Sequence, residues 1–234
     1  MEGFEQLEVV KVERDEGVVT VSLSRPKALN AINEQMLHEL DTVFRGLSED
    51  ASVACVLLTG DGDRAFAAGA DIAAMSKYTQ EQAQGFAEKG HRIFKQIEDF
   101  PAPVLGVING FALGGGCELA LACDVLYASE KAKLGQPEVT LGLMPGFGGT
   151  VRLPRKIGLA AASEWVFTGN VYSAQAAKEV GLVHAVFPHE ELLAEVLKVA
   201  KAIASRGGVA VRASKASMVS GLDTDLASAC TNEQ

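Results

Sequence analysis

Two glutamates, Glu118 and Glu138, lie in segments where the neighbouring side chains are almost all apolar. Glu118 follows three consecutive glycines in residues 109–121 (NGFALGGGCELAL), and Glu138 lies near the start of residues 135–155 (GQPEVTLGLMPGFGGTVRLPR). An apolar pocket and a second carboxylate both raise the pKa of a carboxyl group, so that it can hold a proton near neutral pH. This pair of residues therefore predicts general acid–base chemistry.

Glycine-rich segments next to the acids predict accessible backbone amides. Residues 114–116 directly precede a predicted helix over residues 117–122, and a helix N-terminus has free N–H groups and a positive dipole end. Residues 66–71 (FAAGAD) form a second turn of small residues, before a predicted short helix. Neither segment has the spacing of a GxGxxG or GK[ST] phosphate loop. We expect both segments to present N–H groups to an anionic oxygen.

Each feature also has a structural interpretation. Glu118 could be a first-turn carboxylate stabilised by the helix dipole, worth less than about 1 kcal/mol. Glu138 could be a structural acid paired with Arg152 or Arg155. A two-carboxylate glycosidase also stays open, although the single Trp165 and three tyrosines give no evident sugar-stacking surface. The sequence contains no GxSxG motif and no local Ser–His or Cys–His arrangement for nucleophilic catalysis.

Composition narrows the class of protein. A chain of 234 residues that is 48% hydrophobic is expected to form an ordered core rather than a disordered segment or a simple coiled coil. Its net charge of −9 argues against a binder of nucleic acid or anionic membranes. The first residues, MEGFEQLEVV, have neither a basic n-region nor an apolar h-region, so we expect a cytoplasmic protein. The four cysteines and four histidines match no CxxC or HExxH spacing, which predicts free thiols and no metal site.

Strands and helices alternate along the sequence, which predicts an α/β core with parallel strands. Residues 7–13 and 18–23 predict a hairpin, and Asn33 is the expected N-cap of the next helix. Apolar runs predict buried strands over residues 53–59, 104–108, 124–127 and 183–186. Helical patterns cover residues 79–100, 149–156, 160–167, 173–180, 190–205 and 209–220.

Five segments, in their order along the chain, resemble the enoyl-CoA hydratase/isomerase (crotonase) superfamily over nearly the whole sequence, and its two-glutamate enoyl-CoA hydratases most closely. They are RPKALNA (25–31), FAAGAD, NGFALGGGCELALACD (109–124), GQPE (135–138) and PGFGGT (145–150). The resemblance implies a crotonase-like spiral of ββα units, assembled as a homotrimer or as a homohexamer made of two trimers. We expect residues 1–188 to form the spiral core with the active site. Residues 189–234 are expected to be a helical C-terminal region, incomplete beside family members that continue for a few dozen residues more.

The resemblance also implies an acyl-CoA thioester as the substrate, with no separate cofactor and no metal, because CoA is part of the substrate. Carried over by position, it implies that the N–H groups of Ala70 and Gly115 hold the thioester oxygen. Glu118 and Glu138 match the two acids that handle the water in hydratases, and from the chemistry we expect Glu138 to deliver the α-proton and Glu118 to act as the base on water. The amide of Gly146 is expected to help place that water.

The same resemblance assigns a group of residues to the nucleotide end of CoA. This group consists of the backbone around Lys27, Ala28 and Leu29, together with Ala68, Asp71 and Ile72. Met75, Phe94, Leu143 and Phe147 are interpreted either as an acyl pocket or as core residues, since each type occurs in both.

The implied reaction is reversible syn addition of water to a trans-2-enoyl-CoA, which gives a 3-hydroxyacyl-CoA in fatty-acid or short-chain acyl-CoA metabolism. Because one oxyanion site serves several reactions on this fold, an enoyl-CoA double-bond isomerase is the alternative. Isomerases of the family commonly keep only one acid at the matching positions. A non-catalytic acyl-CoA-binding subunit is opposed by the presence of both acids, and a nucleic-acid-binding role is opposed by the negative charge.

Overall fold

A six-stranded sheet forms the centre of the computed structural model, which describes residue 4, residues 6–231 and residue 233. Its first two strands pair antiparallel, and each later neighbour pairs parallel. In spatial order the strands are β1 (Val10–Asp15), β2 (Val18–Leu23), β3 (Cys55–Gly60), β5 (Val104–Ile108), β7 (Val125–Ser129) and β10 (Ala185–Phe187). The predicted parallel α/β core is confirmed.

The predicted first strand, residues 7–13, is shifted in the structure to Val10–Asp15. The reason is the buried carboxylate of Glu39, whose Oε2 accepts hydrogen bonds from the backbone N–H groups of Glu8, Val9 and Val10 at 3.1, 2.9 and 2.9 Å. Glu8 and Val9 therefore turn their amides toward Glu39 and precede the strand.

A second sheet contains four strands of three residues each: β4 (Ala65–Ala67), β6 (Phe111–Leu113), β8 (Lys133–Gly135) and β9 (Val171–Ser173). Each of β4, β6 and β8 is the next strand in the chain after β3, β5 and β7 of the large sheet. The chain therefore winds as a spiral, with one strand in each sheet per turn, which confirms the expected ββα units. The sequence analysis did not anticipate these four strands.

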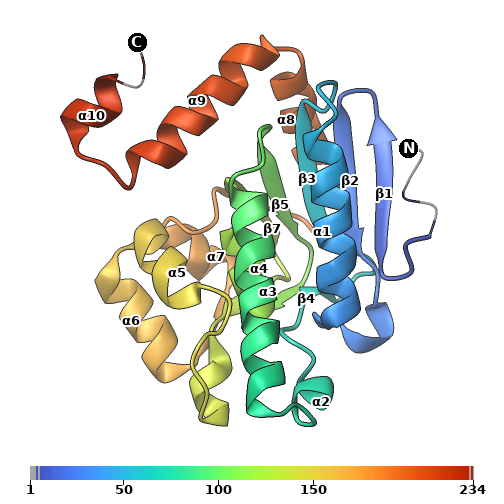
Figure 1. Ribbon diagram of the computed structural model, residues 1–234, viewed down its shortest axis with the longest axis vertical. Helices are drawn as coiled ribbons and strands as arrows, with labels where there is room; N and C mark the ends of the chain where they lie inside the picture. The colour runs from blue at the N-terminus through green and yellow to red at the C-terminus, as the bar shows by residue number, and fades with distance from the viewer. Residues whose placement is uncertain (1–3, 5, 232, 234) are drawn as a thin grey trace.

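Two long helices cover one face of the large sheet, and a third covers the other (Figure 1). On the first face lie α1 (Glu34–Ser48) and α3 (Gln80–Glu98). Asn33 caps α1 by accepting from the N–H of Met36 at 2.9 Å, as predicted, and Thr79 begins α3 with a capping box. On the second face, α8 (Leu192–Ala204) packs apolar residues against strands β2, β3, β5 and β7.

Shorter helices occupy the connections that surround the second sheet. They are η1 (Pro26–Ala28), α2 (Ile72–Met75), α4 (Gly115–Leu121), η2 (Pro137–Leu141), α5 (Gly149–Ile157), α6 (Leu159–Thr168) and α7 (Ala174–Glu179). No helix in the described part of the chain is long and apolar enough to cross a membrane.

The last two helices, α9 (Gly208–Gly221) and α10 (Leu226–Thr231), extend away from the sheets as an arm (Figure 1). A buried lysine on α9, Lys215, fastens the arm, because its Nζ donates to Asp124 Oδ2 at 2.7 Å and to the carbonyl of Ala102 at 3.1 Å. The predicted boundary after residue 188 stays a prediction, and its second part includes residues 232 and 234, which lie outside the described residues.

Candidate active site

One pocket of about 140 Å³ brings together both glycine-rich segments and both acids. Its walls come from the loop after β4, one face of α3, the N-terminus of α4, η2 and the loop that precedes α5. Of the residues predicted for the site, those that line it are Ala68, Ala70, Ile72, Gly115, Glu118, Glu138 and Gly146. Segments more than 75 positions apart in sequence therefore line one pocket.

Two backbone N–H groups lie side by side in this pocket. Ala70 pairs with Ile32 through its neighbours: Ile32 N–H donates to the Gly69 carbonyl and Asp71 N–H donates to the Ile32 carbonyl, both at 2.8 Å. Gly115 is the first residue of α4, so its N–H has no partner inside the helix. Neither the Ala70 nor the Gly115 N–H donates to another group among the described residues. Both amides are available to an oxygen in the pocket.

Glu118 is 2% exposed, and its Oε1 is held by the start of a different helix. It accepts from the N–H of Phe147 at 2.8 Å and from the N–H of Gly149, the first residue of α5, at 2.7 Å. Burial raises the pKa of this carboxyl, while these hydrogen bonds and the charge of Arg152 oppose the rise. A first-turn role in its own helix does not account for this arrangement.

The second oxygen of Glu118, Oε2, accepts no hydrogen bond from the described residues. Among those residues, the buried side-chain nitrogen and oxygen atoms without a partner comprise only Asn109 Oδ1. Oε2 is therefore open to the pocket, with its companion oxygen fixed behind it. The carboxylate presents one oriented, unoccupied acceptor.

Glu138 lies on η2, half-buried, against the glycine that precedes α4. A Cβ atom added at Gly114 would come within 3.0 Å of Glu138 Oε1, so the carboxyl is next to the free amide of Gly115. Burial, with the negative charge of Glu118, raises the pKa of Glu138 to about 7. The side-chain amide of the fully buried Gln136 donates to both oxygens of Glu138, at 3.0 and 3.2 Å, in the orientation that satisfies it.

The structural interpretation of Glu138 is wrong, because neither candidate arginine pairs with it. Arg152 pairs with Glu98 at 3.1 Å, and Arg155 pairs with Asp223 at 3.0 Å. Both arginines lie on α5 and point toward α3 and α9 instead of η2. Among the residues that the structure describes, Glu138 therefore has no cationic partner that would hold it ionised.

Four residues predicted for the CoA nucleotide do not line this pocket: Lys27, Ala28, Leu29 and Asp71. Lys27, Ala28 and Leu29 lie behind the loop of residues 66–71, which contacts them through a hydrogen bond from the Ala68 N–H to the Leu29 carbonyl at 3.0 Å. Lys27 and Ala28 are exposed on η1. The carboxylate of Asp71 caps α2 and pairs with Arg25 at 3.0 Å, so its side chain already has protein partners.

Aromatic rings close the apolar end of the pocket. Met75, Leu143 and Phe147 line it as one interpretation proposed, whereas Phe94 is a core residue that packs edge-on against Phe147 at 5.3 Å. The sequence analysis missed Phe86, which lines the pocket and packs edge-on against Phe147 at 5.2 Å. The helical spacing of residues 83, 86 and 87 on α3, all in the lining, is the signal that could have identified this wall.

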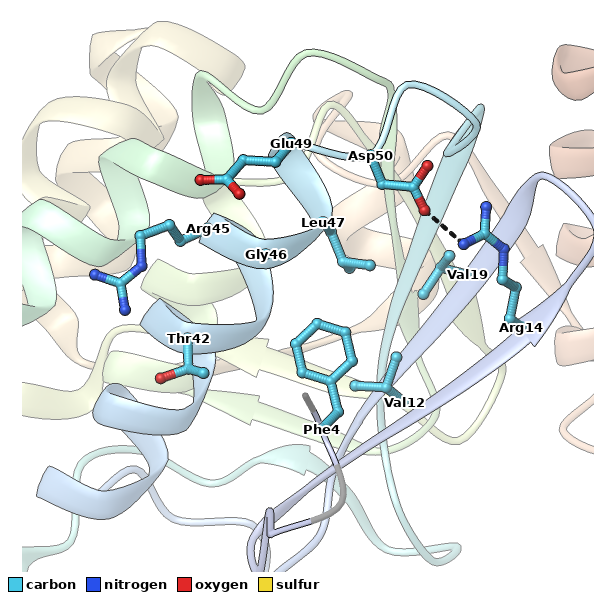
Figure 2. Close-up of a pocket in the computed structure, with 10 residues that line it drawn as sticks. All are labelled: Phe4, Val12, Arg14, Val19, Thr42, Arg45, Gly46, Leu47, Glu49 and Asp50. Atoms are coloured by element: carbon cyan, nitrogen blue, oxygen red, sulfur yellow. Dashed lines mark hydrogen bonds and ion pairs between the residues drawn. The ribbon is translucent and has the colours of Figure 1, made fainter. Parts of the chain in front are cut away.

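A second hollow, of about 480 Å³, lies between α1 and the β1–β2 hairpin (Figure 2). Its floor is apolar, with Phe4, Val12 and Leu47, and its rim holds an ion pair between Arg14 and Asp50 at 2.6 Å. None of the predicted site residues lies there. In the described part of the chain, no group of three or more His, Cys, Asp or Glu residues is placed to hold a metal ion.

Comparisons with known proteins agree with this geometry. The family described as enoyl-CoA hydratase/isomerase matches residues 13–234. The crotonyl-CoA hydratase of Syntrophomonas wolfei is 45% identical over 219 residues, which are 94% of this chain and 84% of that protein. The short-chain-enoyl-CoA hydratase of Clostridium acetobutylicum is 41% identical over 97% of this chain and 87% of its own length. The crystal structure of an enoyl-CoA hydratase from Bacillus anthracis superposes with a TM-score of 0.95 at 40% identity, covering 97% of this chain and 88% of that one. The predicted resemblance is confirmed.

Proposed function

This chain belongs to the enoyl-CoA hydratase/isomerase family, and we propose that it is an enoyl-CoA hydratase, which adds water to a trans-2-enoyl-CoA to give a 3-hydroxyacyl-CoA. The observation that carries this proposal is the pairing of two functions in one pocket. Two free amides, on Ala70 and Gly115, lie beside two carboxyl groups, Glu118 and Glu138, whose pKa values are raised. Acyl-CoA is the substrate class of the family.

In this mechanism the amides of Ala70 and Gly115 donate to the thioester oxygen of the substrate. Addition of water at the β-carbon moves the electrons of the double bond toward that oxygen, which gains the charge of an enolate. Preorganised donors stabilise such charge, and the loss of one donor typically costs about 2.7–4 kcal/mol of activation free energy. The absence of a side chain at Gly115 lets the thioester approach this wall.

The two acids divide the proton transfers. Glu118 Oε2 takes a proton from water as the water oxygen bonds to the β-carbon, and Glu138 gives a proton to the α-carbon as the enolate collapses. One molecule of water is then added, and the cycle closes when Glu118 loses its proton and Glu138 regains one. A pKa of about 7 leaves Glu138 protonated in a large fraction of molecules near neutral pH, as a donor requires. Gly146 is an exposed residue on the same wall, and its amide is assigned to place the water.

An isomerase is the second candidate, because it uses the same oxyanion amides but needs only one acid to move a proton along the acyl chain. The presence of Glu138 beside Glu118 favours the hydratase. The test is to offer crotonyl-CoA and follow the absorbance of the conjugated thioester. If that absorbance stays constant while a 3-enoyl-CoA is consumed, the protein is an isomerase. If neither reacts but CoA esters bind, it is a binding subunit.

We propose a short acyl chain as the preferred substrate. The pocket holds about 140 Å³ and is closed by Phe86 and Phe147. The names of the two relatives, crotonyl-CoA hydratase and short-chain-enoyl-CoA hydratase, support the same size class. The nucleotide end of CoA is assigned to the wall behind Ala68, where Lys27 and Ala28 are exposed and Leu29 is half-buried.

We also propose assembly as a homotrimer or a homohexamer. Large apolar side chains are exposed on α6 and on the arm, where Leu159, Phe167, Val209 and Leu226 are all more than 70% exposed. Large apolar side chains left this exposed are typical of faces that another subunit covers. Light scattering coupled to size-exclusion chromatography would give a mass of three or six chains, and a monomeric mass would contradict the proposal.

A further inference from the structure

We infer that Arg152 is a positioning residue for Glu118: with Glu98, it holds the loop of residues 145–149 whose amides fix the catalytic carboxylate. The inference rests on the hydratase function proposed above. Arg152 does not line the substrate pocket, so it acts through the loop and not on the substrate.

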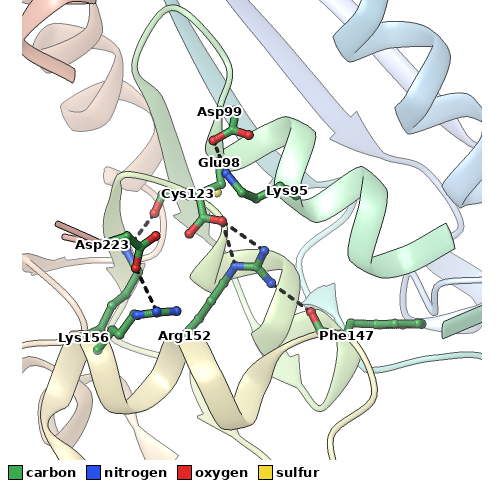
Figure 3. A network of polar contacts seen from close by, with 9 residues as sticks. Lys95, Glu98, Asp99, Cys123, Phe147, Arg152, Lys156 and Asp223 are labelled. Atoms are coloured by element: carbon green, nitrogen blue, oxygen red, sulfur yellow. Dashed lines mark hydrogen bonds and ion pairs between the residues drawn. The ribbon is translucent and has the colours of Figure 1, made fainter. Parts of the chain in front are cut away.

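The link runs through a single residue, Phe147. Arg152 Nη1 donates to the carbonyl of Phe147 at 3.0 Å (Figure 3). The N–H of Phe147 in turn donates to Glu118 Oε1 at 2.8 Å. Each end of this chain of contacts is buried, with Arg152 only 9% exposed. A shift of the Phe147 peptide would therefore move the hydrogen bond that orients Glu118.

Glu98 anchors the guanidinium from the other side. Its Oε2 accepts from Arg152 Nη2 at 3.1 Å and from Nε at 3.3 Å, so three hydrogen bonds that the guanidinium donates hold this planar group in a fixed orientation (Figure 3). The loop leaves room for the Arg152 guanidinium at Gly148. This glycine has φ of +103°, and a Cβ atom there would collide with Arg152 Nη1. Glycine at 148 is required both by its backbone conformation and by the arginine.

The helix dipoles do not explain the positions of the two charges in this pair. Arg152 lies in the first turn of α5, where the helix dipole disfavours a cation, and Glu98 is the last residue of α3, where the dipole disfavours an anion. The ion pair offsets both unfavourable interactions with the helix dipoles. It does not explain why the two charged residues occupy these positions. Arg152 contacts the loop that holds Glu118, and Glu98 contacts Arg152. The N-terminus of α5 also favours the negative charge of the Glu118 carboxylate.

The pair also sets the charge around Glu118. Arg152 lowers the pKa of Glu118, against the effect of burial. Cys117 on α4, Glu138 on η2 and Arg152 on α5 act on this carboxyl directly, while Glu98 and His91 on α3 and Lys156 on α5 face Arg152 or the loop that carries Gly148. Removal of the Arg152 charge should raise the pKa of Glu118, and removal of the Glu98 charge should lower it.

The test compares Arg152→Met and Glu98→Gln with the matched control Arg155→Met. Arg155 lies on the same helix and has an exposed pair with Asp223, so its loss removes an equal charge without touching the loop. We expect Arg152→Met to lower kcat by about tenfold to a hundredfold with little change in KM, because Glu118 is displaced. The acidic limb of kcat/KM, which reports the base of the free enzyme, should move to higher pH. In Glu98→Gln that limb should move to lower pH, and in Arg155→Met it should not move.

A titration of the Glu118 carboxyl by carbon-13 NMR, assigned with Glu118→Gln, gives the same answer without turnover. Arg152→Lys keeps the positive charge but cannot donate to Phe147 and Glu98 together. We therefore expect a lowered kcat, with the acidic limb of kcat/KM at the same pH as in the wild type. This variant replaces Arg152→Met if Arg152→Met does not fold. The inference is overturned if the pKa of Glu118 is unchanged in Arg152→Met. It is also overturned if Arg152→Met and Glu98→Gln move this pKa in the same direction. A wild-type protein that leaves every enoyl-CoA unhydrated would overturn the proposed function instead, while the titration still tests Arg152.

Discussion

A Cβ atom on Gly115 would lie 3.2 Å from the backbone nitrogen of Ala70 and 3.1 Å from the ring of Phe147. The two amides that we assign to the thioester oxygen are therefore adjacent across a space that a methyl group would fill. Gly115 is not among the glycines with positive φ, so its backbone conformation does not require glycine. The close approach of Ala70 and Phe147 does.

Gly115→Ala is expected to lower kcat/KM by about 100-fold to 1,000-fold, because the methyl group blocks one oxyanion donor. Gly85→Ala is the matched control: it lies on α3 with open space around its Cβ position, and it should retain activity with equal or higher stability. Both variants can be assayed with crotonyl-CoA and by thermal unfolding. Equal activity of the two variants would contradict the assigned oxyanion site.

Glu118→Gln and Glu138→Gln should each remove most of the hydration activity, by about 100-fold to 10,000-fold, while CoA-ester binding stays nearly intact. In Glu118→Gln the amide oxygen can still accept from Phe147 and Gly149, which places the amide nitrogen, unable to take a proton, toward the pocket. Turnover and calorimetric binding of a saturated acyl-CoA separate the two effects. Near-wild-type turnover in both variants would rule out the two-carboxylate mechanism.

The rate should fall as the pH rises above about 7. Glu138 must be protonated to deliver the α-proton, and its pKa is raised to about 7 by burial and by Glu118. A profile of kcat/KM against pH checks this, with Glu138→Gln as the comparison: the variant should lose the basic limb along with most of its activity. A wild-type profile that stays level up to pH 9 would contradict the assignment of Glu138 as the acid.

The free energy of unfolding should also depend on the ionisation of Glu138. A carboxyl whose pKa is higher in the folded than in the unfolded state favours folding at low pH, and this contribution is lost as pH rises from the ordinary glutamate pKa of 4.5 through about 7. Glu138→Gln cannot ionise, so its free energy of unfolding relative to wild type should be higher at pH 8 than at pH 4. Urea unfolding at the two pH values measures the difference, and an unchanged or reversed difference would show that Glu138 is not held protonated by the fold.

Local patterns sufficed for the elements that local contacts define. The N-cap at Asn33 and the strand Val104–Ile108 follow from a few neighbouring residues, and the apolar surroundings of Glu118 and Glu138 are visible in the sequence. The second sheet was not predictable in this way, because a three-residue strand is too short to show alternation. The contact of Glu118 with the start of α5 was equally hidden, since it joins groups 29 and 31 positions apart through backbone amides that carry no sequence signal.

Phe86 offers a test of the acyl-chain preference. Its ring closes the pocket and packs edge-on against Phe147 and Tyr78, at 5.2 and 5.7 Å. Phe86→Leu should raise the ratio of kcat/KM for 2-octenoyl-CoA to that for crotonyl-CoA by about tenfold or more, because room for one methylene group is worth about 1–3 kcal/mol in such a pocket. Phe44→Leu is the matched control: Phe44 is fully buried and packs on Phe100, and it does not line the pocket. Both substitutions cost packing energy, but only the first should change the ratio. An equal ratio in the two variants would show that Phe86 does not limit chain length.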